Sequence, residues 1–469
     1  MAENKKLDEL KKKLLCDRKN GYDRFNDGEA AAMESYCADY KVFLDAGKTE
    51  RECAAELIRL AEQAGFRPFD RGMVLKAGDK VYFRNRGKSV YLACIGEKPL
   101  SAGAQITAAH IDSPRLDLKP NPLYEDNELC YFKTHYYGGI RKYQWTTIPM
   151  ELHGVVALKD GRTVTVNIGA DEGDPKLVIT DLLPHLGAEQ NKKPLGEAVP
   201  AETLNLLLGS RPIPEGEGSD RVKLAVMQLL NEKYGIVEED FTSAELEAVP
   251  AARAVDIGLD RSMIGAYGHD DRVCAYAAFR ALLDLGRTPE KTAVCILADK
   301  EEIGSDGVTG MQSAAFDTFM EDLCEAQGVP VRVCLEKSFC LSADVTAAFD
   351  PNFAEVFEKR NAAYLNYGIG LCKYTGARGK SGASDANAET VAYVRGLFDE
   401  AGVLWQIAEL GKVDAGGGGT VAMYMANRNI TTLDAGVPVL SMHAPFETVA
   451  KLDCYETYKG MKAVYLAKN

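Results

Sequence analysis

The chain has 469 residues, of which 46% are hydrophobic and 26% charged, and its formal net charge is −14. This composition excludes a fibrous or disordered chain, and the acidic excess argues against a nucleic-acid partner. No apolar run approaches the roughly 18 residues of a membrane span, and the start, MAENKKLDELKKKLL, lacks the apolar core of a signal peptide. We therefore expect a cytoplasmic protein with no membrane partner, built from two or three domains.

Twelve cysteines are spread along the chain, and none forms a CxxC pair. Most of them lie in apolar segments such as YLACIG and TAVCILA. This setting is typical of buried, reduced thiols in a cytosolic protein, and it favours neither a disulfide framework nor a cysteine-bound zinc ion.

The first hundred residues combine helical and strand patterns. Apolar residues at helical spacing predict a helix over 52–66, which ends near a glycine. Residues 81–96 alternate in the manner of a β-pair, and 104–112 is typical of a buried strand that ends in polar residues. The chain therefore begins with α/β character.

Beyond this start, the pattern changes twice. Alternation with period two and glycine turns predict a mainly antiparallel β region over about 120–258, with an exposed loop at 211–220. After about residue 259, helices alternate with strands as follows: a helix over 271–286, a strand over 292–299, a helix over 311–327, a strand over 329–344, a helix over 386–401, strands over 403–409 and 436–443, and a C-terminal helix.

This order predicts an α/β fold, an open mixed sheet with helices on both faces, interrupted by a β-rich inserted domain. We expect a catalytic domain made of residues 1–118 and 259–469, with residues 119–258 inserted between its two parts.

Five polar clusters lie at or near predicted strand ends: AAHIDS, GHDD, DKEEIGS, LSAD and SMHAPFE. Ligands of open α/β sheets bind beyond the carboxyl ends of the strands, so residues far apart in sequence can converge there. Imidazoles together with carboxylates suit Zn²⁺, Mn²⁺ or Co²⁺, and two such ions form a hydrolytic centre. The candidate residues are His110, Asp112, Asp270, Glu301, Glu302, Asp344 and His443.

Each cluster alone has a simpler explanation. His110 and Asp112 lie on one face of a strand, where Asp112 could orient the imidazole, but a surface His–Asp pair has the same spacing. Adjacent carboxylates at Glu301 and Glu302 repel each other unless a positive charge holds them, although an acidic first turn of a solvated helix would look the same. The common strand-end setting of all five clusters favours a site.

The segments AAHIDSPRLDLKP, GLDRSMIGAYGHDDRVCAYAAFRAL, LADKEEIGSDG, LSADVTAAFDPNF and GVPVLSMHAPFE resemble the signature segments of the M18 metallopeptidases, the aspartyl aminopeptidase and aminopeptidase I relatives. The resemblance runs from about residue 16 to the C-terminus. It implies a zinc-peptidase catalytic domain with an inserted dimerisation domain, and an enzyme that removes the N-terminal residue of short peptides with a free N-terminus.

The resemblance also implies a role for each candidate. His110 and Asp344 would hold one zinc ion, Glu302 and His443 a second, and Asp270 would bridge the two. Glu301 would be the general base and Asp112 would orient His110. The peptide bond between Asp270 and Asp271 would be cis, and subunits would assemble into a tetrahedral dodecamer built from dimers.

Two further residues bear on the substrate. His185 resembles the histidine that the family's dimerisation domain brings into the neighbouring active site, although it could equally be a histidine of a domain core. Lys373 lies where aspartyl aminopeptidases carry a lysine that pairs with an acidic substrate side chain, or it is simply a solvated lysine. The resemblance thus implies an acidic (Asp/Glu) preference.

Other activities stay open at this point. After YYGGI (136–140) the chain departs from the eukaryotic aspartyl aminopeptidases, and DAGGGGTVAMYMANRN resembles M42 enzymes. A broad or leucine-type aminopeptidase, or an M42-like deblocking or glutamyl aminopeptidase, is therefore the alternative. A carboxypeptidase or deacylase would need a basic pocket that the motifs do not indicate, and a non-catalytic scaffold would normally have lost a ligand or the base.

Overall fold

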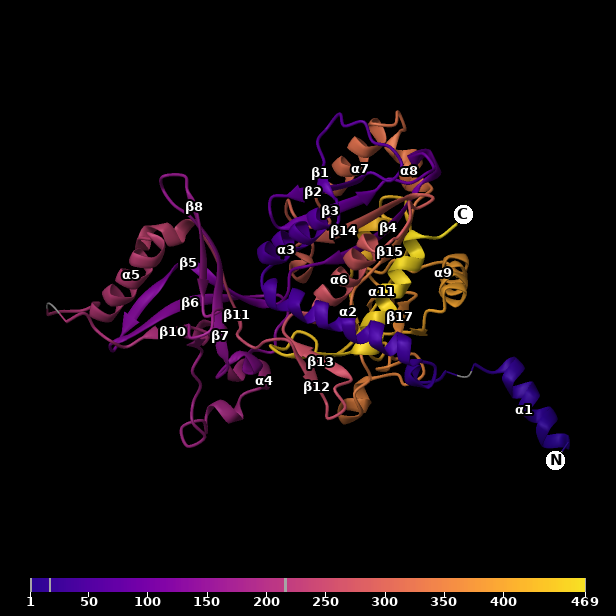
Figure 1. The fold of residues 1–469 in the computed structure, drawn as a ribbon. Helices are drawn as coiled ribbons and strands as arrows, with labels where there is room; N and C mark the ends of the chain where they lie inside the picture. Colours follow the sequence, from indigo (N-terminus) through magenta and orange to yellow (C-terminus); the bar gives the residue numbers. More distant parts are fainter. Residues whose placement is uncertain (1, 17, 215–216, 469) are drawn as a thin grey trace.

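The computed structural model describes residues 2–16, 18–214 and 217–468. Its largest element is a nine-stranded mixed sheet (Figure 1). In spatial order the strands are β1 (Arg67–Pro68), β2 (Lys80–Asn85), β3 (Ser89–Cys94), β14 (Thr292–Ala298), β4 (Ala104–His110), β15 (Phe339–Ser342), β21 (Thr431–Gly436), β17 (Ile369–Cys372) and β19 (Trp405–Ile407).

Helices cover both faces of this sheet, as the sequence predicts. One face packs against α2 (Asp27–Ala46), α3 (Glu50–Gln63), α6 (His269–Leu283), α9 (Ala388–Ala401) and α11 (Lys451–Tyr465). The other packs against α7 (Ala315–Glu325), α8 (Val331–Glu336) and α10 (Ala422–Ala426). Strand β4 serves both cores, because Ile106 and Ala108 point into one and Ala109 into the other.

A seven-stranded, mainly antiparallel sheet forms the second part of the molecule, to the left in Figure 1. Its order is β11 (Ala244–Pro250), β5 (Arg115–Asp126), β6 (Leu129–Tyr137), β10 (Leu206–Gly209), β9 (Leu177–Val178), β7 (Pro149–Ala157) and β8 (Thr163–Ile168). Because β11 also pairs with β7, the sheet closes on itself. Helix α5 (Arg221–Tyr234) packs against it, and α4 (Leu195–Ala198) lies at its end.

A five-stranded sheet lies beside the first and carries the segments around the candidate site. Its order is β12 (Val255–Ile257), β13 (Met263–Ala266), β23 (Glu447–Ala450), β22 (Pro438–Leu440) and β16 (Thr346–Ala347). Two short strands, β18 (Gly376–Ala377) and β20 (Gly417–Gly418), pair separately. Helix α1 (Ala2–Leu14) projects from the body (Figure 1).

One predicted element is wrong. The sequence predicts a single strand over 329–344, but the chain forms helix α8 first and reaches the sheet only at β15. Pro330 precedes the helix, where its fixed φ suits a helix start, and Cys334 and Leu335 turn inward onto the core. The β-branched residues of this segment imitate a strand pattern. Within the described residues, no helix combines the length and apolar character needed to cross a bilayer.

Candidate metal centre

All seven candidate residues lie where strands of the first and third sheets end. His110 is the last residue of β4, Glu301 and Glu302 follow β14, and Asp344 follows β15. These three strands run parallel side by side, so their carboxyl ends meet at one edge. Asp270 is the second residue of helix α6, which follows β13, and His443 follows β22.

Asp270 lies between the two histidines. Its Oδ1 atom is 3.2 Å from Nε2 of His110, and its Oδ2 atom is 3.1 Å from Nε2 of His443. Burial alone would raise the pKa of Asp270, but the two imidazoles beside its oxygens lower that pKa below its usual range. The peptide bond between Asp270 and Asp271 is cis, as the family resemblance implies.

The other carboxylates complete two neighbouring clusters. Asp344 Oδ1 lies 3.7 Å from Nε2 of His110, and Glu302 Oε2 lies 3.5 Å from Nε2 of His443. Two groups have ligand atoms close enough to share a cation: His110 with Asp270 and Glu302, and His110 with Asp271 and Asp344. Asp271 is an addition that the sequence did not indicate, because a buried Asp next to a candidate ligand has no distinguishing pattern.

These side chains have the properties of a cation site. Nε2 of His110, Oε1 of Glu302 and Oδ1 of Asp271 are buried, and none has a hydrogen-bond partner within the described part of the chain. Burial lowers the pKa of His110, but Asp112 and Asp270 outweigh it and raise that pKa well above its usual value. Burial also lowers the pKa of His443, but the negative charges of Asp270 and Glu302 outweigh burial and raise that pKa to about 10. Positive charge is stabilised at both imidazoles, and the mixed nitrogen and oxygen donors suit zinc.

Asp112 is the centre of a hydrogen-bond network. The backbone N–H groups of Glu301 and Glu302 donate to its Oδ1 and Oδ2 at 3.1 and 3.2 Å, and the Tyr137 hydroxyl donates to Oδ2 at 2.9 Å. Its Oδ1 lies 3.3 Å from Nδ1 of His110, which also contacts the Asp112 carbonyl at 3.0 Å. Asp112 thus contacts His110 and also holds the turn that carries both glutamates.

His443 is held by partners from two other segments. Its Nδ1 donates to the carbonyl of Gly139 at 2.7 Å, and its backbone N–H donates to Oε1 of Glu447 at 2.7 Å. The second oxygen of Glu447 accepts the backbone N–H of Asp270 at 3.1 Å. Sequence reasoning missed Glu447, although the residue stands in the SMHAPFE segment.

Glu301 faces the centre without joining either group. Its Oε2 atom lies 3.9 Å from Nε2 of His110. Burial, and next the negative charge of Asp344, raise the pKa of Glu301 to about 8. A carboxylate with this affinity for a proton, held beside a cation site, is suited to accept a proton from water.

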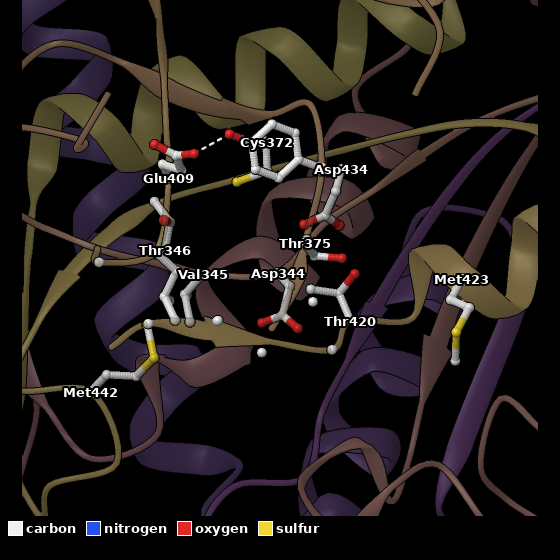
Figure 2. Close-up of a pocket in the computed structure, with 18 of the residues that line it drawn as sticks. Asp344, Val345, Thr346, Cys372, Thr375, Glu409, Thr420, Met423, Asp434 and Met442 are labelled. Atoms are coloured by element: carbon white, nitrogen blue, oxygen red, sulfur yellow. Dashed lines mark hydrogen bonds between the residues drawn. The ribbon is translucent and has the colours of Figure 1, made fainter. Parts of the chain in front are cut away.

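A cavity of about 540 Å³ opens onto these residues. Figure 2 shows Asp344, Asp434, Thr375 and Thr420 gathered in one part of it, with Met442 and Met423 on opposite sides. Arg378, Lys380 and Lys412 also line the cavity and are exposed, which the sequence analysis did not anticipate. Asp434 is buried at its inner wall, and burial, with Asp344 nearby, raises the pKa of this carboxyl group.

Two predicted residues lie apart from this cluster. His185 is exposed on the loop after β9 in the second sheet and does not line the cavity of its own chain. Lys373 follows β17, and its Nζ atom pairs with Asp385 at 2.7 Å instead of lining the cavity. Of the remaining histidines, His269 is buried and bonds to Tyr40 at 2.8 Å, and burial lowers its pKa to about 3.

A buried and a partly buried imidazole lie with carboxylates at the strand ends of an α/β sheet, with a glutamate beside them and a cavity in front. This arrangement defines a metal-dependent hydrolase. The model of the family of aminopeptidase I zinc metalloproteases (M18) matches residues 43–465. The chain belongs to this M18 family, and it is a zinc metallo-aminopeptidase.

Individual relatives agree with this assignment. A probable M18 family aminopeptidase 1 of Clostridium acetobutylicum is 50% identical over 458 residues, which cover 96% of this chain and 98% of the relative. The crystal structure of aminopeptidase I from Clostridium acetobutylicum has a TM-score of 0.91 at 48% identity, covering 97% of this chain and 100% of that one. The M18 aminopeptidase of Thermotoga maritima has a TM-score of 0.92 at 44% identity, covering 96% and 99%.

Proposed function

We propose that the enzyme removes single N-terminal residues from short peptides at a centre of two zinc ions. His110 and Asp344 would hold one ion, Glu302 and His443 the other, and Asp270 would bridge them; Mn²⁺ or Co²⁺ could replace zinc. The observation that carries the proposal is the position of Asp270, whose two oxygens face Nε2 of His110 and Nε2 of His443 at 3.2 and 3.1 Å. When bound, the ions would polarise the scissile carbonyl and acidify the attacking water.

The chain's own residues would handle the proton and the substrate. Glu301 would accept a proton from the attacking water at its carboxylate and later return it to the leaving amine. Its pKa of about 8, raised by burial, supports this role, because a weak base could not hold the proton between the two steps. The free α-amine would dock against carboxylates of the centre, which gives a preference for unblocked N-termini.

The direct test compares free and N-acetylated substrates. Protein stripped of metal and reconstituted with Zn²⁺ should hydrolyse aminoacyl-p-nitroanilides with a free amine and fail on the acetylated forms. Chelation should abolish the activity and added Zn²⁺ should restore it. Hydrolysis of both forms at equal rates, or of neither, would contradict the proposal.

A preference for acidic N-terminal residues is the finer part of the proposal. The exposed cations Arg378, Lys380 and Lys412 around the cavity support it, and Lys373 lies close by in sequence. Both Lys373 and Lys380 pair with Asp385, at 2.7 and 3.0 Å, so a substrate carboxylate would compete with that residue.

Replacing Lys373 by Ala tests this preference. If Lys373 binds the acidic side chain, Lys373→Ala should lower kcat/KM for Asp and Glu substrates about tenfold, as expected for loss of a charged hydrogen bond, and leave Leu substrates nearly unchanged. Lys380→Ala is the matched variant, because it removes the other partner of Asp385. Equal losses on acidic and apolar substrates would remove Lys373 from the specificity pocket.

We further propose that residues 119–258 form a dimerisation domain within the catalytic domain of 1–118 and 259–469, and that dimers assemble into a tetrahedral dodecamer in the cytoplasm. Exposed leucines at 182, 183 and 186 surround His185, which supports a contact that delivers His185 to a neighbouring site. One solved relative, S. cerevisiae mApe1, is described as a dodecamer (TM-score 0.75, 19% identity). All twelve cysteines are free thiols, in keeping with a reducing compartment.

A further inference from the structure

The end of strand β6 contacts both halves of the candidate metal centre. This strand belongs to the second sheet, and its last residue is Tyr137. The Tyr137 hydroxyl donates to Asp112 Oδ2 at 2.9 Å, and two residues later the Gly139 carbonyl accepts from His443 Nδ1 at 2.7 Å. Asp112 in turn contacts His110, so one short segment supports both histidines.

Gly138 lies between these two contacts and is constrained by the site. Its φ of 76° is in the left-handed region, and a Cβ atom built there would come within 3.2 Å of Glu302 Oε2 and 3.3 Å of its Cβ. A glycine adopts this conformation without strain, whereas any side chain there would be strained and would press on Glu302. Each of the three residues from Tyr137 to Gly139 therefore lies against a residue of the candidate centre.

The ring of Tyr137 is fixed by a buried arginine. Arg115 is its partner across the β5–β6 ladder, and the guanidinium carbon lies 3.7 Å from the centre of the tyrosine ring. Arg115 is itself held by Glu247 at 3.1 Å and Glu50 at 3.4 Å, on strand β11 and helix α3. The hydroxyl is thus aimed at Asp112 by side chains from the second sheet and from helix α3, which packs on the first sheet.

We propose that Tyr137 is a positioning residue of the metal centre: it fixes the Asp112 carboxylate, and through Asp112 it orients His110 and the turn of Glu301 and Glu302. This inference rests on the proposed function. The two carboxylate oxygens of Asp112 accept from three donors and also contact the His110 imidazole. Among the described residues, Tyr137 is the only one of these partners that comes from the second sheet. Without it, the carboxylate could rotate and carry the imidazole with it.

Because Tyr137 comes from the second sheet, that sheet is a physical part of the active centre. A displacement of β6 relative to β4 would move Tyr137 and Gly139 together, and would disturb both half-sites at once. The domain proposed to mediate assembly therefore also carries the segment that contacts both halves of the centre.

The test is the affinity for Zn²⁺, measured by competition with a chromogenic chelator, in full-length protein. Tyr137→Phe keeps the ring over Arg115 and removes only the hydroxyl, and we expect it to weaken Zn²⁺ binding about tenfold, the lower end of the range for residues that orient a ligand. Tyr465→Phe is the matched control. It removes the hydroxyl of another fully buried tyrosine, which bonds to Thr107 and to the Ala278 carbonyl.

A double-mutant cycle tests the route through Asp112. In an Asp112→Ala background, Tyr137→Phe should cause no further loss of Zn²⁺ affinity. Unchanged affinity in Tyr137→Phe, an equal loss in Tyr465→Phe, or a full further loss in the Asp112→Ala background would each overturn the positioning role. The variants are checked by near-UV circular dichroism, and if Tyr137→Phe is misfolded, Gly138→Ala gives the second reading: its Cβ should weaken Zn²⁺ binding by displacing Glu302.

Failure of the proposed function gives a different result. Wild-type protein that binds no Zn²⁺ and cleaves no free-amine substrate would refute the metal centre itself, and the role of Tyr137 with it. Wild-type protein that does both, beside a Tyr137→Phe variant of equal affinity, would overturn the positioning role alone.

Discussion

The two large sheets of the molecule differ in how they use their residues. In the nine-stranded sheet, every residue of β3, β4 and β14 is buried, because helices cover both faces. In the seven-stranded sheet, β6 and β8 alternate or remain partly exposed, and apolar residues such as Leu186 face the outside. The first sheet places polar groups at buried strand ends, whereas the second sheet exposes much of its own surface to solvent. Where β6 ends, the second sheet also contacts the candidate metal centre.

The largest effect should come from the first sheet. Glu301→Gln keeps the shape of the side chain but removes the proton acceptor, and we expect kcat to fall at least about a thousandfold, within the range of general-base catalysis. The steady-state rate on a free-amine substrate measures this effect.

Metal content is the control for this variant. Because Glu301 lies outside both cation groups, zinc bound per subunit, measured by atomic absorption, should match the wild type. An active Glu301→Gln protein would refute the proposed mechanism. A metal-free one would instead make Glu301 a ligand.

A change in the second sheet should alter assembly and leave the fold intact. Leu186 is 67% exposed, and Leu186→Asp should prevent the proposed dimer contact by placing a charge in it. Sedimentation velocity should then report smaller particles. Leu224→Asp, on the outer side of α5 at 54% exposure, is the matched control and should sediment like the wild type. Identical sedimentation of both variants would exclude the loop around residue 186 from the interface.

The smallest effect should arise where the two sheets are joined. His153 on β7 lies 2.7 Å from Glu52 of α3 and 3.2 Å from Glu151, which also pairs with Lys48 and Lys176. Burial lowers the pKa of His153, but the two glutamates outweigh it and raise that pKa above its usual 6.5.

A raised histidine pKa stabilises the folded state fully below pH 6.5, and this contribution is lost as pH rises through the folded-state pKa. Wild-type protein should therefore lose more free energy of unfolding between pH 6 and pH 9 than His153→Gln, by on the order of 1 kcal/mol. Urea unfolding at the two pH values measures the difference. If the free energy of unfolding changed equally between pH 6 and pH 9 in both proteins, His153 would not stabilise the contact between β7 and α3.

The sequence indicated polar residues at strand ends, and parallel neighbouring strands bring their carboxyl ends together. His110, Glu302 and Asp344 lie close together for that reason, whereas Asp270 and His443 reach them from the third sheet. By contrast, the parts that depend on contacts between sheets were not predictable.

Tyr137 bonds to a residue 25 positions away, and Glu447 joins His443, four positions away, to Asp270, 177 positions away. No spacing rule indicates the distant partners. Lys373 illustrates a different limit: the resemblance pairs it with a substrate side chain, but in the structure it pairs with Asp385, twelve positions along, and does not line the cavity. The helix at 331–336 was missed because six residues are too few to express a helical period against a β-branched composition.

The spread of the site along the chain has a consequence for its formation during synthesis. His110 and His443 stand 333 positions apart (443 minus 110). A growing chain therefore holds His110 and Asp112 long before it acquires the second histidine. The closure of such a long loop also delays these contacts relative to local ones. We therefore expect the two histidines to come together late in folding, after the strands that carry them have paired.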